Sequence, residues 1–149
     1  CIRDRRCIAY HVNKEGIDPD QASAIATVNG TKVKAGDRVS FDFDGTLSTR
    51  LGRELARREI NSGSTVYVIS ARSNKAGLLD VTRALNIPDE NVYATGSNTD
   101  KVKKITELKI DKHFDNNRNI KRLLPKGIGI NFSLTEEEAE LLIKAILLN

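Results

Sequence analysis

Two acidic residues separated by a single residue, Asp42 and Asp44, could take part in one reaction. They come at the end of an apolar alternation across residues 38–43, which is typical of a buried strand, and they precede Gly45-Thr46, where a strand would turn. Alternate strand residues share a face, so the two carboxylates should point the same way unless the backbone has already begun to turn. Because paired acids repel each other, the pair favours a site for a cation or an electrophile, such as metal-assisted attack on phosphorus.

The segments that must hold these acids alternate between strand and helix patterns from Lys32 onward. Strands are expected at about residues 38–43, 65–70, 91–94, 112–114 and 127–132, and helices at 49–61, 76–85, 100–108, 118–123 and after Thr135. Repeated strand–helix units predict an α/β fold with a Rossmann-like parallel sheet, right-handed crossovers and helices on both faces. Residues 31–149 are therefore interpreted as one α/β core domain.

Residues 1–30 have a different pattern and are interpreted as a helical hairpin appended to this core. Asp18-Pro19 offers an N-cap and a first helical position for the second helix, and Asn29-Gly30 marks its end. Cys1 and Cys7 are six positions apart and would not face each other well on a helix. Neither a disulfide nor a metal site is expected from them.

The expected strand ends carry chemically useful side chains. In parallel sheets, ligands bind beyond the carboxyl ends of the strands, which meet at one edge. The residues at these ends are small, polar or charged: Asp42–Thr46, Ser70-Ala71-Arg72, Thr95-Gly96-Ser97 and Asp115-Asn116-Asn117. We expect these four groups to converge on a single site.

Four of these segments resemble the motifs of the haloacid dehalogenase-like (HAD) hydrolases. Phe41–Leu47 resembles the first motif, and Val66–Ser70 resembles the second, an apolar strand that ends in Ser or Thr. Lys101 is the best match for the lysine of the third motif, and His113–Asp115 resembles the acidic fourth motif. The four matches occur in the family's order and spacing between about residues 38 and 124.

The resemblance implies a role for each matched residue. Asp42 would be the nucleophile that takes the phosphoryl group as an aspartyl phosphate, and Asp44 would be the general acid and then the general base. Ser70 would donate a hydrogen bond to the phosphoryl oxygens, and Lys101 would balance the charge on the nucleophile and the transferring group. Asp115 would complete a Mg²⁺ site with the Asp42 carboxylate and the Asp44 backbone carbonyl.

The fourth motif departs from the family pattern. That motif often carries two adjacent acids, whereas Asp115 is followed by Asn116, which can accept a hydrogen bond from a metal-bound water but brings no charge. Weaker metal binding is therefore expected.

Substrate contacts are expected from residues beside the motifs, namely Gly45, Thr46, Ala71, Arg72 and Asn116.

Simpler structural roles compete with these assignments. Ser70 could cap the turn that follows it, and Asp115 could cap the helix expected from residue 118. Lys103 and Lys104 compete with Lys101 but are more typical of a solvated helix face. His113 is interpreted as a packed strand residue and not as a catalyst.

The spacing of the motifs also bears on the substrate. Family members usually insert a cap domain after the first motif or between the second and third, and neither gap has room for one here. The resemblance therefore implies an open site, as in capless members that act on phosphoproteins or nucleic-acid ends. A Mg²⁺-dependent phosphatase acting on a phosphomonoester is expected. The alternatives are a nucleic-acid-end phosphatase, which the basic charge favours, and a structural or interaction domain without useful catalysis.

The composition of the 149 residues fits a soluble globular protein, with 39% hydrophobic residues, 30% charged residues and a formal net charge of +4. No apolar run approaches the roughly 18 residues of a membrane span, and no signal peptide is evident, so an intracellular location without membrane contact is expected.

The chain lacks methionine, which indicates a processed product or part of a longer protein. The segment around Asp20–Ala26 weakly resembles a helical segment of tailed-phage head and portal proteins. That resemblance implies parent-chain or virion partners through residues 1–30.

Overall fold

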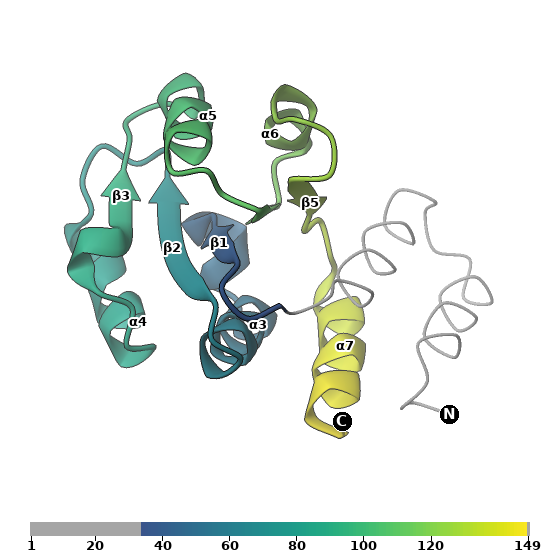
Figure 1. Ribbon diagram of the computed structural model, residues 1–149. Coiled ribbons are helices and arrows are strands. Elements are labelled where there is room, and N and C mark those ends of the chain that lie inside the picture. Colours follow the sequence, from purple (N-terminus) through teal and green to yellow (C-terminus); the bar gives the residue numbers. More distant parts are fainter. Residues whose placement is uncertain (1–33, 149) are drawn as a thin grey trace.

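A computed structural model of the protein describes residues 34–148 (Figure 1). Five parallel strands form one sheet in the order β3-β2-β1-β4-β5. The strands are β1 (Arg38–Phe41), β2 (Thr65–Ser70), β3 (Val92–Ala94), β4 (Lys112–Asp115) and β5 (Gly129–Asn131). This sheet confirms the predicted Rossmann-like α/β fold. The predicted hairpin at residues 1–30, with Cys1 and Cys7, lies outside the described residues.

Helices cover both faces of the sheet. The α-helices are α3 (Arg50–Asn61), α4 (Leu79–Ala84), α5 (Asn98–Glu107), α6 (Arg118–Leu123) and α7 (Glu136–Leu148). One apolar cluster joins α3 and α7 to the sheet, and a second cluster, which includes Ile105 of α5 and Ile120 of α6, covers the opposite face. In Figure 1, α5 and α6 accordingly lie above the sheet and α3, α4 and α7 below it. No helix in the described range is long and apolar enough to cross a membrane.

The strand order reverses next to β1, and this places the first and fourth motifs side by side. Strand β1 pairs with β2 on one side and with β4 on the other, and the register brings Phe41 opposite Phe114. The two rings stack with their centroids 4.8 Å apart. Ligands of open α/β sheets bind at such a reversal, because the chain crosses to opposite faces there and leaves a crevice.

Some predicted boundaries were wrong. Strand β1 ends at Phe41 and not at residue 43, because the chain turns immediately into an irregular helical segment, Phe43–Leu47. The helix predicted at 76–85 is divided into a 3₁₀ turn, Ala76–Leu78, and the shorter α4. The last strand starts later than expected because Gly127, with φ +91°, still belongs to the preceding turn.

Side-chain caps fix the helix starts that matter for the site. The Ser97 hydroxyl accepts from the backbone N–H of Asp100 at 3.1 Å, and the Thr49 hydroxyl accepts from that of Gly52 at 3.1 Å. Each cap satisfies a backbone donor that the first helical turn would otherwise leave without a partner. The N-cap of α5 is thereby fixed at Ser97, four residues before Lys101.

Candidate functional site

The turn after β1 brings the first motif against the fourth. The backbone N–H of Asp42 donates to Phe114 O at 2.8 Å, which continues the β1–β4 pairing by one residue. The chain then turns through Gly45, whose φ is +78°. A β-carbon at Gly45 would lie 2.2 Å from the terminal amide of Asn116. Glycine is therefore required both for this backbone conformation and for the close approach of Asn116.

Lys101 connects two buried carboxylates. Its Nζ donates to Asp42 Oδ1 at 2.8 Å and to Asp115 Oδ2 at 2.9 Å. The side chains of Lys101 and Asp115 are each only 3% exposed, and that of Asp42 is 9% exposed. The competing candidate Lys103 is exposed and Lys104 is half-buried in an ion pair with Glu107, so α5 directs only Lys101 toward these acids.

Asp115 is held by a second layer of polar groups. Its Oδ2 also contacts His113 Nε2 at 2.8 Å, and its Oδ1 accepts from the backbone N–H of Asn117 at 2.9 Å. The far side of the imidazole is occupied, because His113 Nδ1 lies 2.7 Å from Ser40 Oγ. Ser40 and His113 are register partners on β1 and β4, and both are fully buried.

The protonation states in this layer follow from the geometry. Burial lowers the pKa of His113, so the imidazole is neutral at neutral pH. Because a carboxylate only accepts, Nε2–H donates to Asp115 and Nδ1 accepts from the Ser40 hydroxyl. Burial alone would raise the pKa of Asp115, but the hydrogen bond from His113, the charge of Lys101 and the N–H of Asn117 outweigh it and hold this pKa below its ordinary value.

Asp42 has the opposite electrostatic character. Burial, together with the negative charge of Asp115, raises the pKa of Asp42 to about 6, although Lys101 acts in the other direction. The single ammonium of Lys101 thus interacts with two carboxylates. Asp115 accepts more hydrogen bonds than Asp42 does and stays ionised. With a pKa of about 6, Asp42 is ionised at neutral pH, but its ionised form is less favoured than that of an ordinary carboxylate.

Asn116 supplies the remaining contact to Asp42. One terminal atom of its amide lies 2.9 Å from Asp42 Oδ2 and 3.0 Å from the main-chain oxygen of Asp44. This atom is the amide nitrogen, since nitrogen can donate to both oxygens. If the amide turned over, its oxygen would lie beside the two other oxygens, 2.9 Å from Asp42 Oδ2 and 3.0 Å from Asp44 O.

This oxygen set fits a magnesium ion better than a softer metal. Among residues 34–148, no group of three or more His, Cys, Asp or Glu side chains is arranged to hold a metal. One carboxylate, one main-chain carbonyl and one amide would leave several positions to water and to a phosphate oxygen, as Mg²⁺ prefers. Asp115, the predicted third ligand, already has both oxygens engaged by protein donors. The Asn116 amide, and not Asp115, lies next to the second oxygen of Asp42.

Asp44 lies away from the buried cluster and faces Arg72. Arg72 Nη2 and Nε donate to the two carboxylate oxygens of Asp44 at 2.6 and 2.9 Å. These hydrogen bonds hold the pKa of Asp44 below its usual range. The Asp44 side chain is 58% exposed, and the Arg72 guanidinium also lies over the ring of Phe43. The turn at Gly45 therefore gives the two motif acids different surroundings, one buried and one facing solvent.

Ser70 ends β2 beside this ion pair and is buried. Its hydroxyl accepts from the backbone N–H of Arg72 at 3.1 Å, which leaves the hydroxyl hydrogen available to donate. Thr46, another predicted contact, is fully buried, and its hydroxyl has no hydrogen-bond partner within the described structure. Its side chain therefore supports the turn from within and does not face solvent.

The structure brings together Asp42, Ser70, Lys101, Asp115 and Asn116 at one edge of the sheet, with Asp44 and Arg72 at its outer side. Sequence reasoning missed Ser40 and the supporting role of His113. A polar residue inside each of two apolar strands was the available signal. Comparisons of the chain with protein-family models, curated proteins and solved structures found no match.

Proposed function

We propose that the protein is a Mg²⁺-dependent phosphomonoester hydrolase that works through an aspartyl phosphate on Asp42. The observation that carries the proposal is the buried Asp42–Lys101–Asp115 cluster at the strand-order reversal, with Asn116 at the second oxygen of Asp42. A carboxylate that is buried, fixed by a lysine and short of positive charge is suited to a phosphoryl group and its cation. The resemblance of the four motifs to the HAD hydrolases supports the same reaction.

In the first step, an oxygen of the Asp42 carboxylate attacks phosphorus. The bond from phosphorus to the ester oxygen breaks, and Asp44 gives its proton to the leaving oxygen. Asp44 must be protonated for this step, so Arg72 has to shift from the ion pair, for example toward the incoming phosphate, with which it can form the same two-pronged contact. Lys101 and the Ser70 hydroxyl would hold the charge that develops on the phosphoryl oxygens.

In the second step, water attacks the phosphorus of the aspartyl phosphate. Asp44, now a carboxylate, accepts the proton of that water, and the bond between the Asp42 oxygen and phosphorus breaks. Inorganic phosphate leaves, and both carboxyl groups return to their starting states. A bound Mg²⁺, held by Asp42, the Asp44 carbonyl and Asn116, would supply positive charge that offsets the repulsion between carboxylate and phosphate.

The experiment is hydrolysis of a generic aryl phosphate by the full chain. We expect phosphate release that requires Mg²⁺ and falls by at least about a thousandfold in Asp42→Asn, which lacks the nucleophile. Acid-stable, hydroxylamine-labile phosphate on the wild type, absent from Asp42→Asn, would identify the intermediate. Release that continues without Mg²⁺, or without the Asp42 carboxylate, would rule the proposal out.

A non-catalytic role is the rival interpretation, and the Asp44–Arg72 pair favours it. In this arrangement the proposed acid is bound on both oxygens and is held ionised. A structural domain could keep such a pair permanently. The two interpretations differ in Asp44→Asn, because an enzyme should retain phosphorylation of Asp42 by an activated aryl phosphate but lose turnover. A chain that never becomes phosphorylated would support the structural role.

A further inference from the structure

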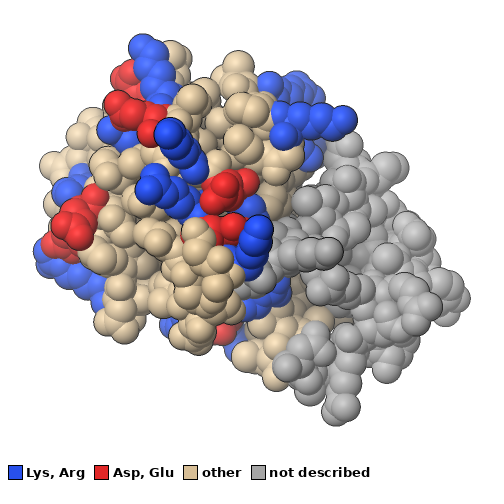
Figure 2. All heavy atoms as spheres, in the orientation of Figure 1, with Lys and Arg blue, Asp and Glu red and all other residues tan. Residues whose placement is uncertain are grey.

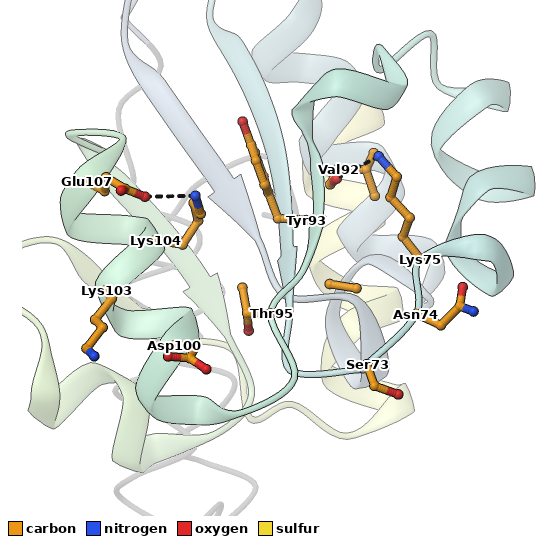
Figure 3. A pocket seen from close by; sticks show the side chains of 11 residues that line it. Ser73, Asn74, Lys75, Val92, Tyr93, Thr95, Asp100, Lys103, Lys104 and Glu107 are labelled. Atoms are coloured by element: carbon orange, nitrogen blue, oxygen red, sulfur yellow. Dashed lines mark hydrogen bonds and ion pairs between the residues drawn. The ribbon is translucent and has the colours of Figure 1, made fainter.

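The cations nearest to Lys101 in the chain lie outside the buried cluster. On the same helix, Lys103 is exposed. Lys104 lies beside the ring of Tyr93, and its Nζ is 2.7 Å from Glu107 (Figure 3). Figure 2 shows further Lys and Arg side chains along the upper edge of the molecule, where α5 and α6 lie; those of α6, all exposed, are Arg118, Lys121 and Arg122. Within the described chain, the buried carboxylates therefore depend on a single ammonium group.

The reaction proposed above changes one of the two groups that hold this ammonium. Asp42 Oδ1 accepts from Lys101 Nζ at 2.8 Å, but the same carboxyl group forms the bond to phosphorus and then no longer is a carboxylate. Asp115 Oδ2 is the other acceptor, at 2.9 Å, and takes no part in bond making. Lys101 can therefore stay in place through both steps only if Asp115 stays ionised and fixed.

Asp115 is supported by a cross-strand pair next to the two acids. Ser40 and His113 are register partners on β1 and β4, and each comes two positions before one of the acids. Alternate residues of a strand share a face, so the pair lies on the same face of the sheet as the acids. His113 Nε2 donates to Asp115 Oδ2 at 2.8 Å, and Ser40 Oγ donates to His113 Nδ1 at 2.7 Å. Hydrogen bonds therefore connect the interior of the sheet to Lys101.

Packing alone does not explain this polar pair. Ser40 and His113 are both fully buried, and in the described part of the chain their side chains form hydrogen bonds only with each other and with Asp115. Apolar residues at these positions would avoid the cost of burying polar groups. The pair is therefore better explained by its effect on Asp115.

We propose that Ser40 and His113 are positioning residues of the phosphatase reaction, which hold Asp115 in the orientation that keeps Lys101 against Asp42 and the phosphoryl group. The inference rests on the proposed phosphatase function and adds two residues to it. His113 acts through its Nε2–H, and Ser40 acts by fixing the ring that carries this donor. Neither residue touches the substrate, because both are fully buried.

The first test is spectroscopic and does not depend on activity. Long-range ¹H–¹⁵N spectra of the full chain distinguish a protonated ring nitrogen from a bare one, and the signals that disappear in His113→Gln belong to His113. We expect the proton on Nε2 and a bare Nδ1. A proton on Nδ1 alone would overturn the inference, because Nε2 could then not donate to Asp115.

The second test is kinetic and compares two substitutions of His113 on an aryl phosphate with Mg²⁺. His113→Leu lacks the donor and should lower kcat about 10–100-fold with little change in KM, as loss of a hydrogen-bonding group behind a metal site commonly does. His113→Gln keeps a side-chain N–H and should recover most of the lost activity. A packing role would rank the variants in the opposite order, since leucine suits a buried position better than glutamine.

Ser40→Ala has a matched control in Ser64→Ala. Ser64 Oγ donates to Glu59 Oε1 at 2.9 Å, beside the buried ion pair of Glu59 with Lys112 at the opposite ends of the strands. Each substitution removes one hydroxyl from a buried polar group, so thermal melts should show similar losses of stability. Only Ser40→Ala should lower kcat, by up to about tenfold. This comparison decides the matter if His113→Leu does not fold.

The inference and the proposed function can fail separately. If the wild type hydrolyses phosphate and kcat is unchanged in His113→Leu, or falls equally in Ser40→Ala and Ser64→Ala, the inference is wrong and the proposed function stands. The expected imidazole signals in a chain without any hydrolysis would reject the proposed function and leave the pair as a structural support of Asp115.

Discussion

Asp42 and Asp115 share one ammonium group, with Lys101 Nζ 2.8 Å from Asp42 Oδ1 and 2.9 Å from Asp115 Oδ2. The sharing is unequal, because Asp115 also accepts from His113 and from the backbone of Asn117. The negative charge of Asp42 is therefore less well compensated than that of Asp115. Burial and the charge of Asp115 raise the pKa of Asp42 to about 6. Opposite effects on stability are expected from neutralising the two acids.

Asp42→Asn should stabilise the metal-free protein at neutral pH. A folded pKa of about 6 against the ordinary 3.8 means that the folded state binds more protons between these values, so stability falls as the pH rises through this range. The loss amounts to about 3 kcal/mol above pH 6. Thermal melts in EDTA should show the variant above wild type at pH 7.5, with the difference vanishing near pH 4.

Asp115→Asn is the matched comparison and should destabilise the protein at pH 7.5. The lowered pKa of Asp115 means that its ionised form stabilises the fold above its unfolded pKa and that this contribution is lost as the pH falls through the folded pKa. An amide also cannot accept all the donors that now meet the carboxylate. A rise in thermal midpoint for Asp115→Asn would contradict the unequal sharing.

Lys101→Met should cost about 3–5 kcal/mol of stability at pH 7.5, since it leaves two buried carboxylates without their shared cation. Part of this loss should be recovered as the pH falls from about 7 to 5, because protons can then replace the ammonium. Urea unfolding at both pH values measures the effect. Lys103→Met, on the exposed side of the same helix, should behave like wild type.

Gly45→Ala should disturb Asn116 before it disturbs the rest of the fold. The added methyl would meet the Asn116 amide at 2.2 Å, and φ at this position is +78°. We expect a loss of about 1–2 kcal/mol from the strained backbone and weaker Mg²⁺ binding by calorimetry. Gly96→Ala is the control, since φ is +88° there with no atom within 4 Å of the new methyl. If both variants bind Mg²⁺ equally, Asn116 is not part of the metal site.

Arg72→Lys should lower phosphatase activity by about tenfold or more with little change in thermal midpoint. In the proposed mechanism the guanidinium moves from the two oxygens of Asp44 to the phosphate, and a lysine cannot form two parallel hydrogen bonds with either group. The pair is largely exposed, so its contribution to folding is small. Full activity in Arg72→Lys, measured as kcat/KM on an aryl phosphate, would mean that only the positive charge at this position matters.

The fold class and most of the elements could be predicted from the sequence pattern alone. The alternation across residues 38–43 and the β-branched run at 65–70 predicted strands that lie at the centre of the observed sheet. Thr135 also caps its helix as expected, with the hydroxyl accepting from Glu138 N and the Glu138 carboxylate accepting from Thr135 N. These features depend on local periodicity and capping, which a sequence records directly.

How the charges are shared at the sheet edge depends on the packing of distant segments and could not be predicted from the sequence. Asp42 and Lys101 are 59 positions apart, and their contact depends on the strand order, which the sequence pattern does not specify. The same holds for the Ser40–His113–Asp115 chain and for the pairing of Asp44 with Arg72. The pKa of a carboxyl group depends on its burial and on every charge near it in space. The sequence could place the two acids at one strand end, but only the packed structure gave them different protonation behaviour.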